Sequence, residues 1–362
     1  MRPFFDIPNN ELLAWLQAHG QPAMRARQIR RWIIQGRAES FEQMTDLPLG
    51  LRVALTDAFT PLGTQTSRHQ QAVDGTHKLL LSLPDSELIE CVLIQEDQRR
   101  TACISTQVGC GMGCVFCASG INGVVRNLTA SEILDQLLRL RNLLPEQERL
   151  TNVVVMGMGE PLANLDSLLA SLDVATAKDG LGLSARHVTI STVGLPAKIK
   201  RLADLGKPYH LAVSLHAPND ALRTRIVPTN PKTGLARILN AAEYFFEKTG
   251  RRVTYEYVLL GGLNDAPHHA SELARLLRGR NALVNLIPFN NVPGLPYQRP
   301  TEESLKVFGD RLRASGITVA VRKRKGSEIE AACGQLRRTV QRSAVGDSES
   351  QQISQTALPM LD

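Results

Sequence analysis

Residues 109–118 read Gly-Cys-Gly-Met-Gly-Cys-Val-Phe-Cys-Ala, and this stretch says more about the chain than any other. It spaces Cys110, Cys114 and Cys117 as Cys-x3-Cys-x2-Cys. Three thiolates that ligate a [4Fe–4S] cluster leave one iron without a protein ligand. That iron can chelate the amino and carboxylate groups of S-adenosylmethionine (SAM) and pass it an electron, and cleavage then yields a 5′-deoxyadenosyl radical. Glycines between the cysteines suit a loop that wraps tightly around an inorganic cluster.

A zinc site and reactive core cysteines are the alternative interpretations of this stretch. Zinc normally takes a fourth ligand, and no further Cys or His lies close enough in the sequence to supply it. The chain has six cysteines, and three of them within eight residues are typical of ligation or catalysis in a reducing compartment. The aromatic Phe116 just before the last cysteine, and the position at the start of β–α units, resemble the radical SAM superfamily.

Downstream of the cysteines, apolar runs alternate with amphipathic segments. The apolar runs are 152–156, 187–191, 210–215, 253–260, 283–287 and 318–322, and the amphipathic segments are 129–143, 164–177, 197–205, 235–249, 268–279 and 301–314. Repeated β–α units imply a parallel sheet. We therefore expect an α/β fold built on a partial (β/α) radical SAM barrel, with its chemistry at the C-terminal ends of the strands.

A basic helical region precedes this core. Residues 9–60 are predicted to be helical, since Ile29, Trp32 and Ile33 fall on one face at helical spacing. Several arginines remain for the outer surface, where they either hold phosphates or form a solvated face. They are Arg25, Arg27, Arg30, Arg31 and Arg37.

Between the helical region and the core, residues 75–105 are predicted to form short strands with a turn at 84–86. The expected organisation has four parts. These are a helical RNA-binding accessory domain (1–72), a β extension (73–105), the barrel with a C-terminal cysteine segment (106–342) and a disordered tail (343–362).

Composition limits the remaining possibilities. The 362 residues are 43% hydrophobic and 21% charged, which is ordinary for a globular protein. No run of about 18 apolar residues predicts a membrane span, and the N-terminus lacks the apolar core of a signal peptide. We therefore expect a cytoplasmic protein. The net charge of +7 favours a polyanionic partner, although many soluble proteins are mildly basic.

Polar residues at strand ends form a candidate SAM-binding set. The glycine-rich stretch 156–161 would let the methionine end of SAM approach the backbone, with Glu160 placed to accept from its ammonium group. Each residue taken singly is better explained as an ordinary loop residue, whereas together they predict one binding site at the mouth of a barrel. The set comprises Gly159, Glu160, Ser191, Ser214, Leu215, His216 and Asn290.

Two further cysteines connect the chain to a family. Cys103 lies in Thr-Ala-Cys-Ile-Ser-Thr-Gln-Val-Gly, and Cys333 lies in Glu-Ala-Ala-Cys-Gly-Gln-Leu. With the cysteine motif, Gly-Met-Gly-Glu-Pro-Leu, Ser-Leu-His-Ala-Pro and Ile-Pro-Phe-Asn, these stretches resemble the RlmN/Cfr adenine methyltransferases from about residue 10 to 340. Without this resemblance, Cys103 and Cys333 would be interpreted as small buried apolar residues.

The resemblance implies a separate role in the reaction for each of three residues. Cys333 would take a methyl group from one SAM, and the radical from a second SAM would activate that methyl group for addition to adenine. Glu90, otherwise interpreted as a surface charge on an edge strand, would remove the ring proton. Cys103 would then attack Cys333, forming a transient disulfide and releasing the methylated base. Cys91 has no such role, and strand alternation places it on the face opposite Glu90.

The resemblance also implies the substrate. RlmN members methylate carbon 2 of adenosine in 23S rRNA, at the peptidyl-transferase centre, and also in tRNA next to the anticodon. Such a base must leave its stack, and the basic stretch 322–325 either anchors the RNA backbone there or is a solvated strand end. The helical N-terminal region and Val108 favour RlmN over Cfr-like methylation of carbon 8. We further expect a monomer that receives electrons from a flavodoxin or ferredoxin.

Two other classes of protein remain as alternatives. A tRNA methylthiotransferase needs three more cysteines in an N-terminal domain, and the first 90 residues contain none. A non-catalytic RNA-binding module with a structural metal site is compatible with the basic helices. It does not explain Cys103, Cys333 and the glycine-rich loops together.

Overall fold

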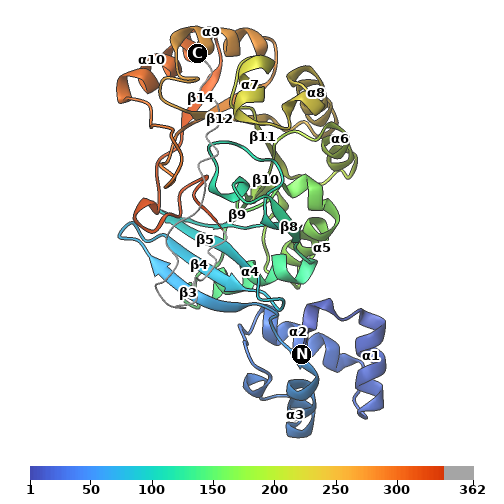
Figure 1. Ribbon diagram of the computed structural model, residues 1–362. Coiled ribbons are helices and arrows are strands. Elements are labelled where there is room, and N and C mark those ends of the chain that lie inside the picture. Colours follow the sequence, from blue (N-terminus) through green and yellow to red (C-terminus); the bar gives the residue numbers. More distant parts are fainter. Residues whose placement is uncertain (338–362) are drawn as a thin grey trace.

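The computed structural model describes residues 1–337 and shows a small helical domain at one end of a larger α/β body (Figure 1). The predicted tail, 343–362, lies outside the described residues. The helical domain contains α1 (Asn9–Ala18), α2 (Met24–Ile34) and α3 (Leu49–Ala58), and its chain ends are joined by the short parallel strands β1 (Arg2–Pro3) and β2 (Phe59–Thr60). As helical spacing predicted, Ile29 and Ile33 of α2 are buried, whereas Trp32 stays partly exposed and donates to Asp46.

One continuous sheet forms the body. Its strand order is β14-β13-β12-β11-β10-β9-β6-β5-β4-β3. The antiparallel strands are β3 (Gln65–Gln71), β4 (His77–Ser82), β5 (Leu88–Glu96) and β6 (Arg99–Cys103). The parallel run continues through β9 (Asn152–Val155), β10 (Val188–Thr192), β11 (His210–Ser214), β12 (Val253–Leu259), β13 (Ala282–Pro288) and β14 (Thr318–Val321).

The β extension and the core therefore share a sheet. β6 pairs antiparallel with β5 on one edge and parallel with β9 on the other. The strands predicted from the six downstream apolar runs are confirmed. The domain ranges remain a prediction, and their boundary at residue 105 falls just after the strand that joins the two parts.

Helices cover the parallel strands. They are α4 (Ala130–Asn142), α5 (Leu165–Thr176), α6 (Pro196–Asp204), α7 (Asp220–Ile226), α8 (Leu235–Thr249), α9 (Pro267–Leu276) and α10 (Glu302–Ala314). Six of them match the predicted amphipathic segments. α7 was not predicted, because seven residues are too few to show a helical period. A capping box between Thr129 and Glu132 starts α4.

α4 joins the helical domain to the sheet. Leu134 and Leu138 belong to the core of the helical domain, whereas Ile133 and Leu137 belong to the core of the sheet. Arg37 was expected on the outer surface. Instead its guanidinium donates to backbone carbonyls of residues 144–148, because that loop leaves several carbonyls unpaired beside α2. None of the helices in residues 1–337 has the length and apolar character needed to cross a bilayer.

Candidate active site

The three clustered cysteines lie in the loop of a short hairpin. β7 (Gln107–Gly109) and β8 (Val124–Asn127) form its arms. The Cys110 amide donates to the Gly123 carbonyl at 2.9 Å. Gly109 has φ +76°, and a Cβ there would lie 2.1 Å from that same carbonyl oxygen, so the turn into the cysteine loop requires glycine. All three thiols line one cavity at the C-terminal ends of β9 to β13.

The donor set fits an iron–sulfur cluster. Burial raises the pKa of all three thiols, that of Cys110 to about 12, so ionised sulfurs here need a cationic partner. Within residues 1–337, no three Cys, His, Asp or Glu side chains surround a point closely enough for a single metal ion. A four-iron cluster makes a different demand, because each thiolate binds its own iron atom. Three thiols on one loop therefore suit a cluster in chemical type and number.

Most of the predicted SAM-binding set lines the same cavity. Gly159, Glu160, Ser191, Ser214, His216 and Asn290 all do so. Gly159 has φ +104°, and a Cβ there would lie 2.7 Å from Gln107. The buried Oδ1 of Asn290 has no hydrogen-bond partner, while its Nδ2 donates to the Cys333 carbonyl. An orphaned acceptor in this cavity fits a ligand that carries an ammonium or amino group.

Glu160 and His216 have their polar atoms largely committed to the backbone. The Glu160 carboxylate accepts from the Leu162 and Val193 amides, which leaves part of its acceptor capacity toward the cavity. His216 Nδ1 accepts from the Val258 amide, and burial lowers the pKa of His216 to about 3, so the ring is neutral. The Leu215 side chain packs in the core and does not line the cavity, because it follows Ser214 on the opposite side of the chain.

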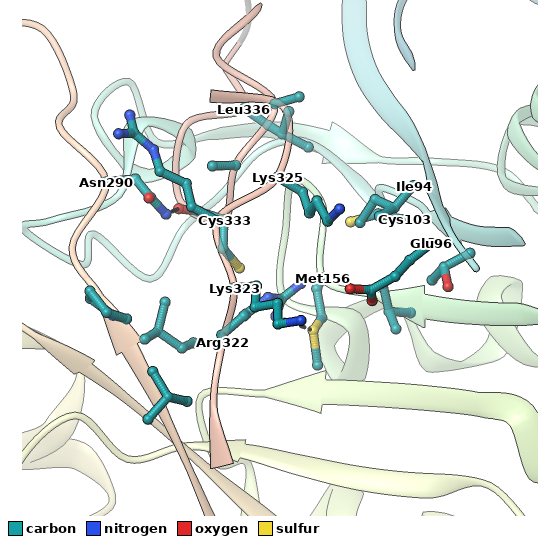
Figure 2. Close-up of a pocket in the computed structure, with 18 of the residues that line it drawn as sticks. Ile94, Glu96, Cys103, Met156, Asn290, Arg322, Lys323, Lys325, Cys333 and Leu336 are labelled. Atoms are coloured by element: carbon teal, nitrogen blue, oxygen red, sulfur yellow. Dashed lines mark hydrogen bonds between the residues drawn. The ribbon is translucent and has the colours of Figure 1, made fainter. Parts of the chain in front are cut away.

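A second cavity, of about 480 Å³, shares lining residues with the first. Figure 2 shows this second cavity. Cys103 at the end of β6 and Cys333 from the C-terminal segment both line it, and Cys333 also lines the cysteine-loop cavity. Both are free thiols. Burial raises the pKa of Cys103 to about 12. The two cavities therefore meet at Cys333.

The larger cavity is strongly cationic. A single carboxylate, that of Glu96, accompanies six basic side chains on its lining within residues 1–337. The basic residues are Arg99, Arg299, Arg322, Lys323, Arg324 and Lys325. Arg322 lines both cavities and its Nη1 lies 3.5 Å from Met156 Sδ. The basic stretch 322–325 thus lines the cavity, and Lys323 and Arg324 within it remain exposed.

The segment that carries Cys333, residues 326–337, is fastened on several sides. The Ala118 amide donates to the Gly334 carbonyl at 2.8 Å, and Ser119 Oγ donates to the Leu336 carbonyl at 2.6 Å. These bonds tie the segment to the cysteine loop. Its other side meets Glu90, whose Oε2 accepts from the Arg337 amide at 2.9 Å.

Glu90 is buried, not a surface charge. It shares its face of β5 with Val92 and Ile94, and Val92 pairs with Cys103. Its Oε1 lies 3.0 Å from Lys78 Nζ. Burial raises the pKa of Glu90, and Lys78 opposes that effect. Cys91 lies on the other face of the strand, fully buried in the core, as strand alternation predicted.

Sequence reasoning missed Lys78 and the environment of Glu90. The signal for Lys78 was a single lysine in the otherwise apolar strand His77-Lys-Leu-Leu-Leu, where an unpaired charge would be costly. Its partner on the next strand was not readable from local pattern. Arg322 was noted only as one member of a basic stretch.

The comparisons with known proteins agree with this geometry. Residues 104–274 match the family model described as radical SAM superfamily, and residues 4–60 match the one described as ribosomal RNA large subunit methyltransferase N-terminal domain. A probable dual-specificity RNA methyltransferase RlmN from Rhodopirellula baltica is 54% identical over 91% of this chain and 89% of its own length. A dual-specificity RNA methyltransferase RlmN from an Anaeromyxobacter strain is 45% identical over 91% of this chain and 89% of its own.

A solved structure shares the fold. The crystal structure of a radical SAM methyltransferase from Sphaerobacter thermophilus is 43% identical, with a TM-score of 0.89. The match covers 93% of this chain and 99% of that chain, and so includes both the helical domain and the sheet.

Proposed function

The chain belongs to the RlmN family of radical SAM RNA methyltransferases, and on that premise we propose that it methylates carbon 2 of adenosine in 23S rRNA and in tRNA next to the anticodon. One observation carries the proposal. Two free thiols from distant parts of the chain, Cys103 and Cys333, line a cationic cavity that adjoins the three-cysteine cavity. RNA phosphates suit the cationic lining, and a flipped adenine suits a cavity of this kind.

The enzyme uses a [4Fe–4S] cluster and SAM. Cys110, Cys114 and Cys117 would hold the cluster, and the set of Gly159, Glu160, Ser191, Ser214, His216 and Asn290 would hold SAM beside it. When bound, the cluster supplies one electron for the reductive cleavage of SAM. The neutral His216 ring and the orphaned Asn290 Oδ1 offer this site hydrogen-bonding capacity without adding a charge.

Three protein side chains carry out the other steps of the reaction. Cys333 takes and carries the methyl group, which its place between the two cavities permits. Glu90 accepts the ring proton, and the raised pKa that burial gives this carboxylate makes it a stronger base than an exposed one. The Cys103 thiolate then attacks the Cys333 sulfur, which bears the base through a methylene group, and the sulfur–carbon bond breaks. The electron pair of that bond leaves with the methylene carbon, which takes up a proton to become the methyl group of the released base, and a Cys103–Cys333 disulfide remains.

We extend the proposal to the setting of the enzyme. Reduction of the cluster calls for a one-electron donor of the flavodoxin or ferredoxin type. We propose that the enzyme acts as a monomer in the cytoplasm, where its RNA substrates are found.

The test is mass spectrometry of nucleosides. RNA that lacks the modification is treated anaerobically with cluster-reconstituted protein, SAM and a reductant. 2-Methyladenosine is the expected product. 8-Methyladenosine would move the protein to Cfr-like chemistry. Release of 5′-deoxyadenosine without any methyladenosine would keep the radical chemistry and overturn the RNA substrate.

A further inference from the structure

A buried ion pair connects two neighbouring strands beside the Cys333 segment. Lys78 of β4 and Glu90 of β5 lie 3.0 Å apart, and their side chains are only 6% and 5% exposed. The strand register pairs Lys78 with Val92 and Leu80 with Glu90. The two charged residues are therefore diagonal neighbours on one face of the sheet. A buried ammonium group is costly unless it is well paired, so its presence in an apolar strand points to a specific task.

Each member of the pair also holds the Cys333 segment. Lys78 Nζ donates to the Glu330 carbonyl at 3.3 Å, and Glu90 Oε2 accepts from the Arg337 amide at 2.9 Å. Glu330 precedes Cys333 by three residues, and Arg337 follows it by four. The pair thus fixes the segment on both sides of the thiol.

The bond from Lys78 reaches a strained residue of the segment. Glu330 has φ +52°, a left-handed conformation that a residue with a side chain adopts only when its surroundings impose it. Its carbonyl meets Lys78, and its carboxylate accepts from Arg337 Nη2 at 2.8 Å. The Glu330 amide also donates to the Ser327 carbonyl at 3.3 Å, so loss of the Lys78 ammonium group would remove one of three contacts that hold this residue, and the only one to its carbonyl within residues 1–337.

We propose that Lys78 is a positioning residue of the active site, holding the Glu90 carboxylate against the Cys333 segment so that the proton acceptor and the methyl-carrying sulfur face the same adenine. The inference rests on the proposed function, because it assumes the roles given there to Glu90 and Cys333. Lys78 acts through Glu90 and Glu330, and needs no contact with RNA or SAM.

Lys78 also affects the pKa of Glu90. Within the described residues, the charged groups that act on Glu90 are Lys78 from β4 and Arg337 from the Cys333 segment, and Glu330 in turn pairs with Arg337. Burial raises the pKa of Glu90, whereas Lys78 lowers it. Removal of the ammonium group therefore raises that pKa further, and the acid limb of the pH–rate profile moves to higher pH by about one unit or more.

The test compares Lys78→Met, Lys78→Arg, Glu90→Gln and the double variant Lys78→Met/Glu90→Gln in the full-length, cluster-reconstituted enzyme. Two steps are measured separately. Methylation of Cys333 by SAM without RNA is followed by mass spectrometry of the protein, and methyladenosine formation is followed across pH. Lys78→Met should lower the rate of methyladenosine formation about 10- to 100-fold, and should lower the rate of Cys333 methylation much less, because only the former needs the Glu90 carboxylate. Lys78→Arg should restore most of that rate.

The double variant distinguishes a positioning role from general damage. If Lys78 acts through Glu90, adding Lys78→Met to Glu90→Gln should slow methyladenosine formation little further. A Lys78→Met enzyme with the wild-type rate and the wild-type pH profile would overturn the inference. Should this variant fail to fold, Lys78→Gln, which keeps a donor for the Glu330 carbonyl, replaces it, and wild-type values for both steps would overturn the inference in the same way.

A readout without turnover separates this inference from the proposed function. Hydrogen exchange of the amides in residues 326–337 should be faster in Lys78→Met than in wild type, and unchanged exchange would contradict the positioning of the segment. Absence of methyladenosine with the wild-type enzyme would instead overturn the proposed function, whatever the exchange data show.

Discussion

Two cysteines on adjacent strands show how the face of the sheet decides chemical role. Cys91 of β5 points into the core between sheet and helices, whereas Cys103 of β6 lines the cavity shared with Cys333. Both are free and buried. Cys91 faces the core and Cys103 faces the cavity, so the same substitution at the two positions is a matched test of the role proposed for Cys103.

Substitution of the resolving thiol should trap the reaction. Cys103→Ala leaves no sulfur to attack Cys333, so RNA should remain covalently attached to Cys333 and turnover should stop. The adduct is measured on denaturing gels with labelled RNA under turnover conditions. Cys91→Ala should release RNA as wild type does and show only a modest loss of stability. Free RNA alone in the Cys103→Ala lanes would show that Cys103 is not the resolving thiol.

At the scale of elements, α4 has two apolar stripes. One stripe packs in the core of the helical domain and the other in the core of the sheet. Beside the Leu134–Leu138 stripe lies Asp135, whose Oδ2 accepts from the Gly63 and Thr64 amides at the end of the helical domain. Its Oδ1 is buried without a hydrogen-bond partner. Burial raises the pKa of Asp135 to about 7, well above the usual range of an aspartate.

This raised pKa predicts a pH-dependent junction. The folded protein binds a proton at Asp135 that the unfolded chain releases near pH 4, so stability is greatest below that pH and falls as pH rises toward 7. The expected loss is about 2 to 4 kcal/mol. Asp135→Asn keeps an acceptor for both amides and should flatten the dependence.

Urea unfolding between pH 5 and pH 8 measures the effect. The two tryptophans of the chain, Trp15 and Trp32, both lie in the helical domain, so their fluorescence reports on this junction. Equal pH dependence in wild type and Asp135→Asn would assign the effect to other groups.

The elements also show what sequence can predict. Strands β9 to β13 followed from apolar runs to within a residue or two, since buried parallel strands are continuously hydrophobic. The cysteine loop followed from its cysteine spacing and its glycines. The joining of β6 to β9 and the Lys78–Glu90 pair did not, because both depend on which strands become neighbours across the sheet. The local sequence pattern does not indicate which strands become neighbours.

At the scale of the whole molecule, clusters of basic side chains line two separate hollows within residues 1–337. One is the larger cavity beside Cys333. The other is the face of α2, where Arg27, Arg30 and Arg31 line a hollow against the end of α5 and the loop after it, which contribute Asp173 and Asp179. α2 lies in the helical domain, at the opposite end of the molecule from α10 (Figure 1). An RNA that places one base in the cavity and rests on α2 would cover much of this length.

The α2 face should contribute to affinity through phosphate contacts. Arg27 and Arg31 are exposed, so Arg27→Gln/Arg31→Gln removes two charges with little effect on packing. Each lost phosphate contact should lower the steepness of log affinity against log salt by about 0.7 to 0.9. Filter binding of substrate RNA across salt concentrations measures this slope.

The control variant is Arg311→Gln/Arg313→Gln on the exposed side of α10, which makes the same change in net charge at the far end of the molecule. Similar slopes for the two double variants would mean that α2 contributes only net charge, whereas a loss confined to α2 would place RNA along the helical domain while its target base occupies the cavity.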